Sequence, residues 1–140
     1  MICRRAFFPG IFCILDSSIY VFGGQDGSED LKMCEKYSVA ENVWRPIQPM
    51  NEARNGSSCV ILDKAIFVFG GNSQQKNSLD SVERYSIEYD CWERMRIRLK
   101  SPLQDSLAFN LGGYRVLILG GSNNNVANLR MDVYDLSAEC

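Results

Sequence analysis

Four acidic residues lie in the polar segments of this 140-residue chain, and carboxylates are the first residues to consider for catalysis. Asp26, Glu29, Asp30 and Asp80 could act as general acid and base in the hydrolysis of a sugar. That chemistry needs two carboxylates at a defined separation, and the sequence pairs none of the four with another or with a base. We therefore expect no catalytic residue and no enzyme activity.

Metal and cofactor chemistry has little support in the sequence. There is no histidine, and the six cysteines show no C-x-x-C pair and no metal-ligand spacing, which excludes copper or zinc chemistry of the usual kinds for this chain. Gly-Gly pairs occur at residues 23–24, 70–71 and 120–121, but no helical segment or G-x-x-x-x-G-K pattern accompanies them. We instead expect each pair to let the chain turn sharply and a neighbouring backbone come close, because glycine has no Cβ. We expect no metal and no cofactor.

The elements that position these residues repeat along the chain. Residues 13–24 and 60–71 are two versions of one pattern, an apolar run that ends in Gly-Gly, and residues 116–121 are a weaker third version. A unit of about 50 residues that recurs in this way is typical of a radially repeated all-β array. The repeat therefore predicts the architecture, but it does not by itself indicate a function.

The second half of each unit repeats as well. Residues 35–38 (Glu-Lys-Tyr-Ser) match residues 83–86 (Glu-Arg-Tyr-Ser), and residues 132–135 follow in the third unit. Tyr37 is followed by Trp44 and Tyr85 by Trp92, whereas the Trp expected after Tyr134 would fall just beyond Cys140. We expect the third unit to be truncated.

Together with Pro49-Met50 and Arg54, these landmarks resemble the kelch repeat. The resemblance covers almost the whole chain and implies a kelch-type β-propeller. We expect two complete four-stranded blades and a truncated third, within repeats at approximately 5–53, 54–103 and 104–140. Because closed propellers need about four to eight blades, three alternatives stay open: a piece of a longer chain, self-association that closes a propeller, or a short open array.

Local patterns predict the strands. Most apolar residues in the runs are β-branched or aromatic, and the second run of each unit is apolar throughout, as expected of a strand buried on both faces. Asp16-Ser17-Ser18, Asp63-Lys64-Ala65 and Gly112-Gly113 are expected as hairpin turns. The predicted strands are residues 12–15, 19–23, 33–37 and 43–47, then 59–62, 65–70, 81–85 and 91–97.

Composition indicates an ordinary globular domain. The chain is 46% hydrophobic and 23% charged, and its net charge of −2 offers no case for nucleic-acid binding. No apolar run reaches the roughly 18 residues of a membrane span. Arg4-Arg5 and the following apolar residues could be a secretory signal, but cleavage there would remove a predicted strand. We expect a cytoplasmic protein, in which the Asn55-Gly56-Ser57 sequon carries no glycan.

The cysteines are expected to be free thiols in a reducing compartment. Cys34, Cys59 and Cys91 occupy strand positions that we interpret as core positions. The full set is Cys3, Cys13, Cys34, Cys59, Cys91 and Cys140.

Recognition residues are expected in the loops, because the strands are needed for packing. In kelch propellers, the loops after Gly-Gly and the linkers between blades resemble the rim of a binding face. Arg54 matches the family's recurring arginine, for which we favour a structural role over ligand contact, and the third linker lacks it. The candidates for partner binding are Gln25, Asp26, Asn51, Arg54, Asn55, Asn72, Ser73, Ser122 and Asn123.

Four cations alternate with apolar residues in one segment. An extended strand would place Arg94, Arg96, Arg98 and Lys100 on one face and Met95, Ile97 and Leu99 on the other. This basic stripe is either an outer edge strand protected by charge, which we favour, or a docking stripe for an acidic peptide or a phosphate.

The resemblance implies a non-catalytic protein-recognition module with a protein or peptide partner. The repeats look like those of kelch proteins that recruit substrates to cullin-type ubiquitin ligases, although the BTB domain that makes this link is absent. Two alternatives remain: a structural protein such as an actin binder, or a sugar-active enzyme that uses Asp26 or Asp80.

Overall fold

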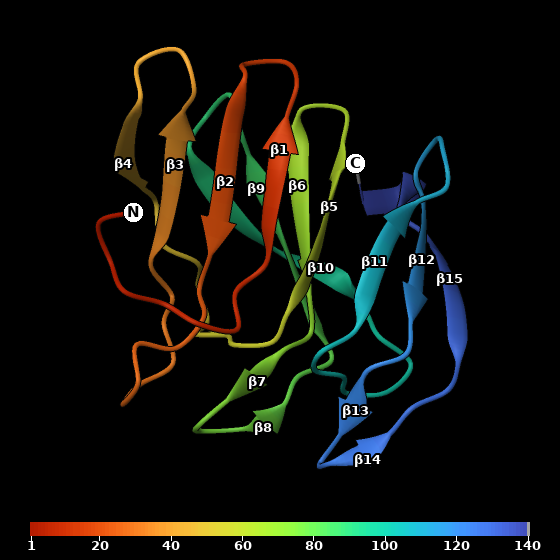
Figure 1. Ribbon diagram of the computed structural model, residues 1–140. Helices are drawn as coiled ribbons and strands as arrows, with labels where there is room; N and C mark the ends of the chain where they lie inside the picture. Colours follow the sequence, from red (N-terminus) through yellow and green to blue (C-terminus); the bar gives the residue numbers. More distant parts are fainter. Residues whose placement is uncertain (140) are drawn as a thin grey trace.

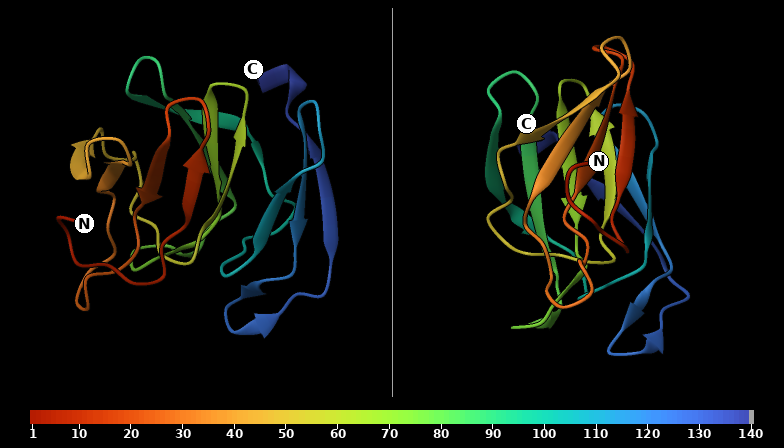
Figure 2. Two further views of the ribbon diagram at one scale, coloured as in Figure 1. Left: turned by 45° about the horizontal axis from the view of Figure 1, so that its top comes forward. Right: turned by 60° about the vertical axis from the view of Figure 1, so that its left-hand side comes forward.

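A computed structural model describes residues 1–139 as three antiparallel sheets that lie side by side, one for each repeat (Figures 1 and 2). The all-β fold of kelch-type blades, two of them complete, is confirmed. Blade 1 has the order β1 (Gly10–Cys13), β2 (Ser18–Phe22), β3 (Cys34–Ser38) and β4 (Val43–Ile47). Blade 2 contains β5 (Ser58–Leu62), β6 (Ala65–Phe69), β9 (Ser81–Ser86) and β10 (Cys91–Arg98). Blade 3 contains β11 (Leu107–Asn110), β12 (Arg115–Leu119) and β15 (Met131–Asp135).

Short elements lie in segments that the sequence indicated only as loops. One small hairpin joins β7 (Asn72–Ser73) to β8 (Asn77–Ser78), another joins β13 (Ser122–Asn123) to β14 (Val126–Ala127), and a 3₁₀ turn, η1, covers Ser137–Glu139. Asn124 and Asn125 form the turn of the second hairpin with φ of 48° and 65°. Asparagine tolerates this left-handed conformation better than most residues, so the polar run favours a tight turn.

Two apolar clusters hold the blades together. Tyr20 and Phe22 of blade 1 pack against Ile66 and Val68 of blade 2, while the alternate residues of β6 pack against Val116 and Ile118 of blade 3. All five residues of β6 are buried, as the unbroken apolar run predicts. In β12 burial alternates, because no further blade covers the second face of blade 3.

Gly70 shows why Gly-Gly follows the second strand. Its φ is +57°, and a Cβ at this position would lie 2.3 Å from the carbonyl oxygen of Leu103. The position therefore needs both the conformational freedom and the small size of glycine, as the sequence predicts.

The tyrosine and tryptophan of each complete blade pack against each other within it. Tyr37 lies 5.1 Å from Trp44, and Tyr85 lies 5.1 Å from Trp92, between ring centroids. The Trp92 Nε1–H donates to the carbonyl of Gln48 at 2.8 Å, so this tryptophan also connects blade 2 to the end of blade 1.

One predicted strand is displaced. The sequence indicates residues 12–15, whereas β1 is Gly10–Cys13. Cys13 pairs with Ser18, so the turn of blade 1 spans residues 14–17, and Ile14 is 82% exposed within it. In blade 2, Leu62 pairs with Ala65, so the turn consists of Asp63 and Lys64, and Ala65, the third residue of the expected turn, begins β6.

Candidate functional site

Loops from all three blades gather at one end of the molecule, the lower end in Figure 1, which we call the loop end. It contains the segments that follow β2, β6 and β12 and the linkers between blades. Neighbouring loops are tied together: Gln74 N–H donates to Asp30 Oδ2 at 2.7 Å, and its side-chain amide donates to the carbonyl of Ser28 at 2.8 Å. The loop end is therefore one connected surface rather than separate loops.

A polar groove of about 630 Å³ lies at the loop end between blades 1 and 2. Three segments and one further side chain line it: residues 29–33, 51–53 and 73–76, with Arg94. Both charge signs are present, since Lys32, Lys76 and Arg94 face a lining that also contains Glu29, Asp30 and Glu52. This groove is the candidate functional site.

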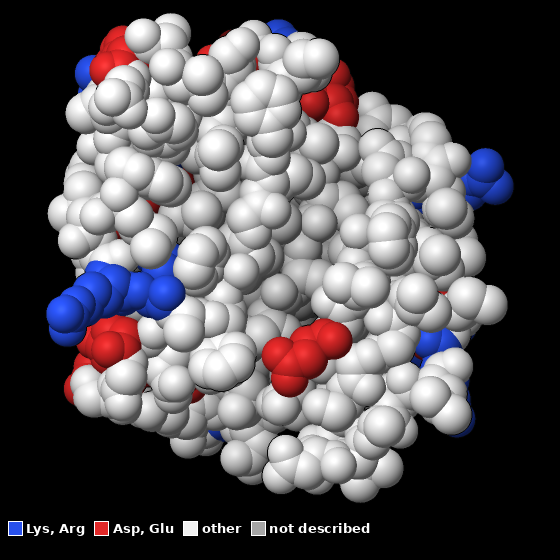
Figure 3. All heavy atoms as spheres, viewed as in Figure 1, with Lys and Arg blue, Asp and Glu red and all other residues white. Residues whose placement is uncertain are grey.

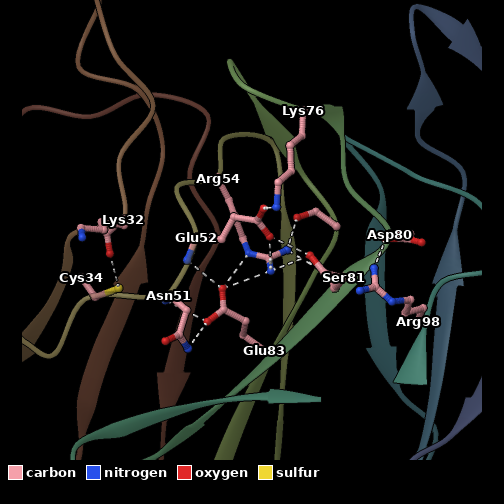
Figure 4. Close-up of polar contacts among 11 residues, drawn as sticks. Lys32, Cys34, Asn51, Glu52, Arg54, Lys76, Asp80, Ser81, Glu83 and Arg98 are labelled. Atoms are coloured by element: carbon pink, nitrogen blue, oxygen red, sulfur yellow. Dashed lines mark hydrogen bonds and ion pairs between the residues drawn. The ribbon is translucent and has the colours of Figure 1, made fainter. Parts of the chain in front are cut away.

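Arg54 fixes the linker beneath the groove (Figure 4). Its side chain has no exposed surface. One nitrogen, Nη1, donates to the carbonyls of Gly70 at 2.7 Å and Ser81 at 3.0 Å, and Nη2 lies 3.1 Å from Glu83 Oε1. Burial lowers the pKa of Arg54, and the charges of Glu83 and Glu52 oppose that effect.

Glu83 uses both carboxylate oxygens to hold the linker. One oxygen accepts the backbone and side-chain N–H groups of Asn51 at 2.9 and 2.7 Å, and the other accepts the backbone N–H of Glu52 at 3.2 Å. The charge-assisted contacts and the buried arginine together give residues 51–54 a defined position.

Glu52 connects this buried network to the groove surface. It pairs with the exposed Lys76 at 2.7 Å and accepts the Ser81 hydroxyl at 3.0 Å. Burial acts to raise the pKa of Glu52, but the hydrogen bonds from Lys76 and Ser81 and the charges of Arg54 and Lys76 outweigh it, so the pKa lies below its usual value. The carboxylate is therefore ionised at neutral pH.

Blade 1 has its own version of this network, which the sequence analysis missed. Arg5 donates to the carbonyls of Gly23 at 2.7 Å and Met33 at 2.8 Å, and it lies 3.6 Å from Glu35. Its Nε and Nη2 are buried without a hydrogen-bond partner. The signal was its place at the start of the first repeat, where it matches Arg54.

Blade 3 lacks a buried arginine–glutamate pair like that of blade 2. The backbone contact is kept, because the carbonyl of Leu103 accepts the N–H of Gly71 at 2.8 Å just as that of Arg54 accepts the N–H of Gly24 at 2.7 Å. Leu103 is buried, and the cation is instead Lys100, whose Nζ lies 2.5 Å from Asp132. In the third linker, Leu103 therefore takes the place of the buried arginine, and the Lys100–Asp132 ion pair lies beside it.

The structure distributes the nine predicted loop residues over several environments. Asn51 and Ser73 line the groove, although Ser73 is only 6% exposed. Asp26 is exposed and caps its own loop by accepting the N–H groups of Ser28 and Glu29 at 2.9 Å each. Arg54 is buried and occupies the structural role favoured from the sequence. The others, all partly buried, are Gln25, Asn55, Asn72, Ser122 and Asn123.

The sequence did not single out two of the three basic residues of the groove, Lys32 and Lys76. Lys32 and Lys76 carry no motif, and they meet only because the chain folds blade 1 against blade 2.

Three residues of the predicted basic stripe, Arg94, Arg96 and Arg98, lie on β10, the outermost strand of blade 2, and Lys100 lies two residues beyond its end. The four cations of the stripe are exposed, while Met95, Ile97 and Leu99 pack into the core, so the alternation follows the expected pattern. Arg98 pairs with Asp80 at 2.5 Å. Arg94 is the stripe residue that lines the groove.

The cysteines differ in environment. Cys13 and Cys34 are buried, and burial raises the pKa of the Cys34 thiol to about 12. Cys91 is exposed, so its assignment to a core position was wrong, because it begins an outer strand beside a turn. Cys3 and Cys59 are partly buried, and Cys140 lies outside the described residues.

The residues of the Asn55-Gly56-Ser57 sequon are engaged in contacts within the chain. The Asn55 side-chain amide donates to Asp30 at 2.5 Å, and Ser57 is 8% exposed. Within residues 1–139, no group of side chains is arranged to hold a metal ion, and no helix is long and apolar enough to cross a membrane.

Repeated four-stranded antiparallel sheets with a buried arginine at each complete blade define a propeller-type repeat protein. Comparison with known proteins identifies the class further: the family described as "Kelch motif" matches residues 12–51 and 53–96, which together make up more than half of the chain. The chain belongs to the kelch-repeat family.

Similar proteins are kelch-like proteins of much greater length. Kelch-like protein 23 of Homo sapiens is 35% identical over 79 residues, which cover 56% of this chain and 13% of that protein. Kelch-like protein 38 of Mus musculus is 32% identical over 128 residues, covering 88% of this chain and 22% of that protein. Kelch repeat and BTB domain-containing protein 2 of Ectromelia virus (strain Moscow) is 24% identical over 111 residues, covering 68% and 20%. The chain thus spans about a fifth or less of these relatives.

Proposed function

We propose that this chain is a non-catalytic protein-interaction module that binds a protein or peptide partner in the loop-end groove. The observation that carries the proposal is the groove itself, an open polar cavity with charges of both signs on a network that fixes its linker. Its floor is held by buried contacts of Arg54 and Glu83, so the lining is ordered before a partner arrives. Such preorganisation reduces the ordering cost of binding.

The contact residues of this proposal come from both blades. Asn51, Ser73 and, as part of the basic stripe, Arg94 were expected from the sequence, and the groove also contains Lys32 and Lys76. The remaining loop candidates extend the same end of the molecule toward blade 3. Arg54 has a positioning role, because its side chain is fully buried.

A cytoplasmic adaptor that recruits substrates to a ubiquitin ligase is the cellular role we propose. The support is the similarity to kelch-like proteins and to a protein whose name includes a BTB domain. Actin binding is the alternative, and cosedimentation with filaments that persists at moderate salt would favour it.

We also propose that two copies of the chain associate through the free faces of blades 1 and 3. Ile19 is partly exposed on blade 1, and Val21, only 3% exposed, lines the same apolar hollow. Their counterparts Ile66 and Val68 on blade 2 are buried against blade 1. On blade 3, Met131 and Val133 are 68% and 53% exposed. The two free faces therefore correspond to the two halves of a blade interface. In the view of Figure 3, most charged side chains lie toward the margins, and one acidic group lies near the lower centre. Exposed apolar surface of this kind favours association.

Light scattering of the purified chain tests this second proposal. A cooperative dimer of twice 15.8 kDa is the expected result, and a folded monomer would contradict self-association.

Selection of peptides from a displayed library against the chain tests the groove. Lys76→Glu and Arg94→Glu should each weaken the binding of selected peptides about tenfold or more, because they reverse a charge at the contact. Lys64→Glu makes the same change in the exposed β5–β6 turn, away from the groove, and is the matched control. Equal binding by all three variants would contradict the assignment of the groove.

A further inference from the structure

A second, smaller cavity of about 110 Å³ adjoins the loop-end groove in blade 2. Glu52, Lys76 and Arg94 line both cavities, so the smaller one is a side pocket of the groove. The residues that line the side pocket alone are Arg54, Leu79, Asp80, Ser81, Val82, Met95 and Arg98. The side pocket therefore joins the buried network of Arg54 to the basic stripe on β10.

Positive charge is in excess around the side pocket. Its lining contains four cations and two carboxylates, whereas the main groove contains three of each. Glu83 adds a carboxylate beneath the pocket, but its oxygens already bind Arg54 and the linker backbone. Arg94 takes part in no ion pair within residues 1–139. Burial lowers the pKa of Arg54 and the charge of Arg94 adds to this effect, so the two cations repel each other. An anion in the side pocket would offset this repulsion.

The other two cations of the side pocket make exposed ion pairs (Figure 4). Lys76 lies 2.7 Å from Glu52 and is 63% exposed, and Arg98 lies 2.5 Å from Asp80 and is 62% exposed. Solvent weakens such pairs, so both cations can turn toward a more strongly charged group at little cost. A phosphoryl group carries a charge of about −1.5 to −2 at neutral pH and is such a group.

The size and walls of the side pocket suit one small anion. A volume of about 110 Å³ is roughly that of three or four water molecules in the liquid, which is enough for a phosphoryl group. Leu79 and Val82 are buried and Met95 is partly buried, so part of the wall is apolar and strengthens ionic contacts beside it. Arg94 and Arg98 can each donate two hydrogen bonds to phosphoryl oxygens.

We propose that the side pocket binds the phosphoryl group of a phosphoserine or phosphothreonine in a peptide that lies in the loop-end groove. Arg94 and Arg98 donate to the phosphoryl oxygens from β10, and Lys76 supplies a third cation from the β7–β8 turn. Recognition of phosphorylated peptides by clusters of arginine is a general binding mode. This inference rests on the function proposed for the groove and adds the chemical class of its partner.

Three peptide libraries separate this inference from the proposal for the groove. Each library has varied flanks around one fixed central residue, which is phosphoserine, glutamate or serine, and is passed over the immobilised full chain. Retained phosphoserine peptides should bind at least about tenfold more tightly than their serine and glutamate versions in fluorescence anisotropy. A serine or glutamate version that binds as tightly would overturn the phosphoryl assignment and leave the groove proposal standing. Retention of no peptide from any library would overturn both.

Substitutions locate the phosphoryl group. Arg98 lines the side pocket and not the main groove, so Arg98→Gln should reduce the tenfold preference for phosphoserine to about threefold or less. Lys32 lines the main groove alone, so Lys32→Gln should weaken the phosphoserine and serine versions alike and keep the preference. Lys64→Gln in the exposed β5–β6 turn is the matched control and should change neither affinity. An unchanged preference in Arg98→Gln, with thermal unfolding like that of the wild type, would overturn the location.

Discussion

Blades 2 and 3 use the same backbone position in chemically opposite ways. At residue 54 a buried arginine makes an ion pair with Glu83, whereas at residue 103 a buried leucine makes none. The carbonyl oxygens of both residues nevertheless accept a glycine N–H at 2.7 and 2.8 Å. Backbone contacts and apolar packing are therefore enough to join a linker to its blade. The arginine additionally fixes the position of its linker, of which residues 51–53 line the groove.

Blade 1 is intermediate between these two cases. Arg5 makes the same two carbonyl contacts as Arg54, but Met33 and Cys3 stand where blade 2 has Ser81 and Glu52. Nε and Nη2 of Arg5 consequently lack hydrogen-bond partners, although Nη2 lies 3.6 Å from Glu35. The complete network of buried arginine contacts is therefore found in blade 2, whose preceding linker lines the groove.

Removing Arg54 should give the largest effect. Arg54→Leu copies blade 3 but leaves Glu83 buried and without its cation, and breaking a buried pair in this way costs about 3–5 kcal/mol. Urea unfolding measures the loss. Arg5→Leu is the matched control and should cost less, because Arg5 makes fewer contacts. Equal losses would contradict the comparison.

Substitutions in the Gly-Gly turns should destabilise blades 2 and 3 to different extents. A Cβ at Gly70 would lie 2.3 Å from a backbone oxygen, whereas at Gly120 the nearest atom would be 3.7 Å away. Both residues have positive φ, so Gly120→Ala should cost about 1–2 kcal/mol and Gly70→Ala about 2–4 kcal/mol. Thermal unfolding of the two variants tests the order, and the reverse order would show that blade 3 is packed more closely than described.

Lowering the pH should destabilise blade 2 through protonation of Glu52. Because the pKa of Glu52 in the folded chain is held below its usual value of 4.5, its contribution to stability is present above that pH and is lost as the pH falls through the lower folded value. Glu52→Gln should remove this part of the pH dependence. Unfolding free energies measured between pH 6 and about pH 3 should converge for the two proteins at low pH; parallel curves would contradict the assignment.

Removing the Lys100–Asp132 ion pair of blade 3 should have the smallest effect on stability. Lys100 is 61% exposed in its contact with Asp132, and solvent screens such pairs. Lys100→Met should leave the urea midpoint nearly unchanged. A loss as large as that of Arg54→Leu would mean that Lys100 substitutes fully for the buried arginine.

Local signals predicted most of the fold. Unbroken apolar runs indicated β6, and Gly-Gly indicated the close approach at Gly70, because each depends on residues adjacent in sequence. Cys91 was misplaced because its exposure depends on which strand lies at the outer edge. Lys32 and Lys76 escaped notice because the groove joins segments of two blades, and no local pattern records that junction.

A double-mutant cycle tests the central claim, that the Arg54–Glu83 pair orders the linker of blade 2. Arg54→Leu, Glu83→Leu and the double variant would be compared with the wild type by urea unfolding. Each single change should be strongly destabilising and the double variant much less so than their sum, because two apolar residues leave no buried charge. Additive losses would contradict the account.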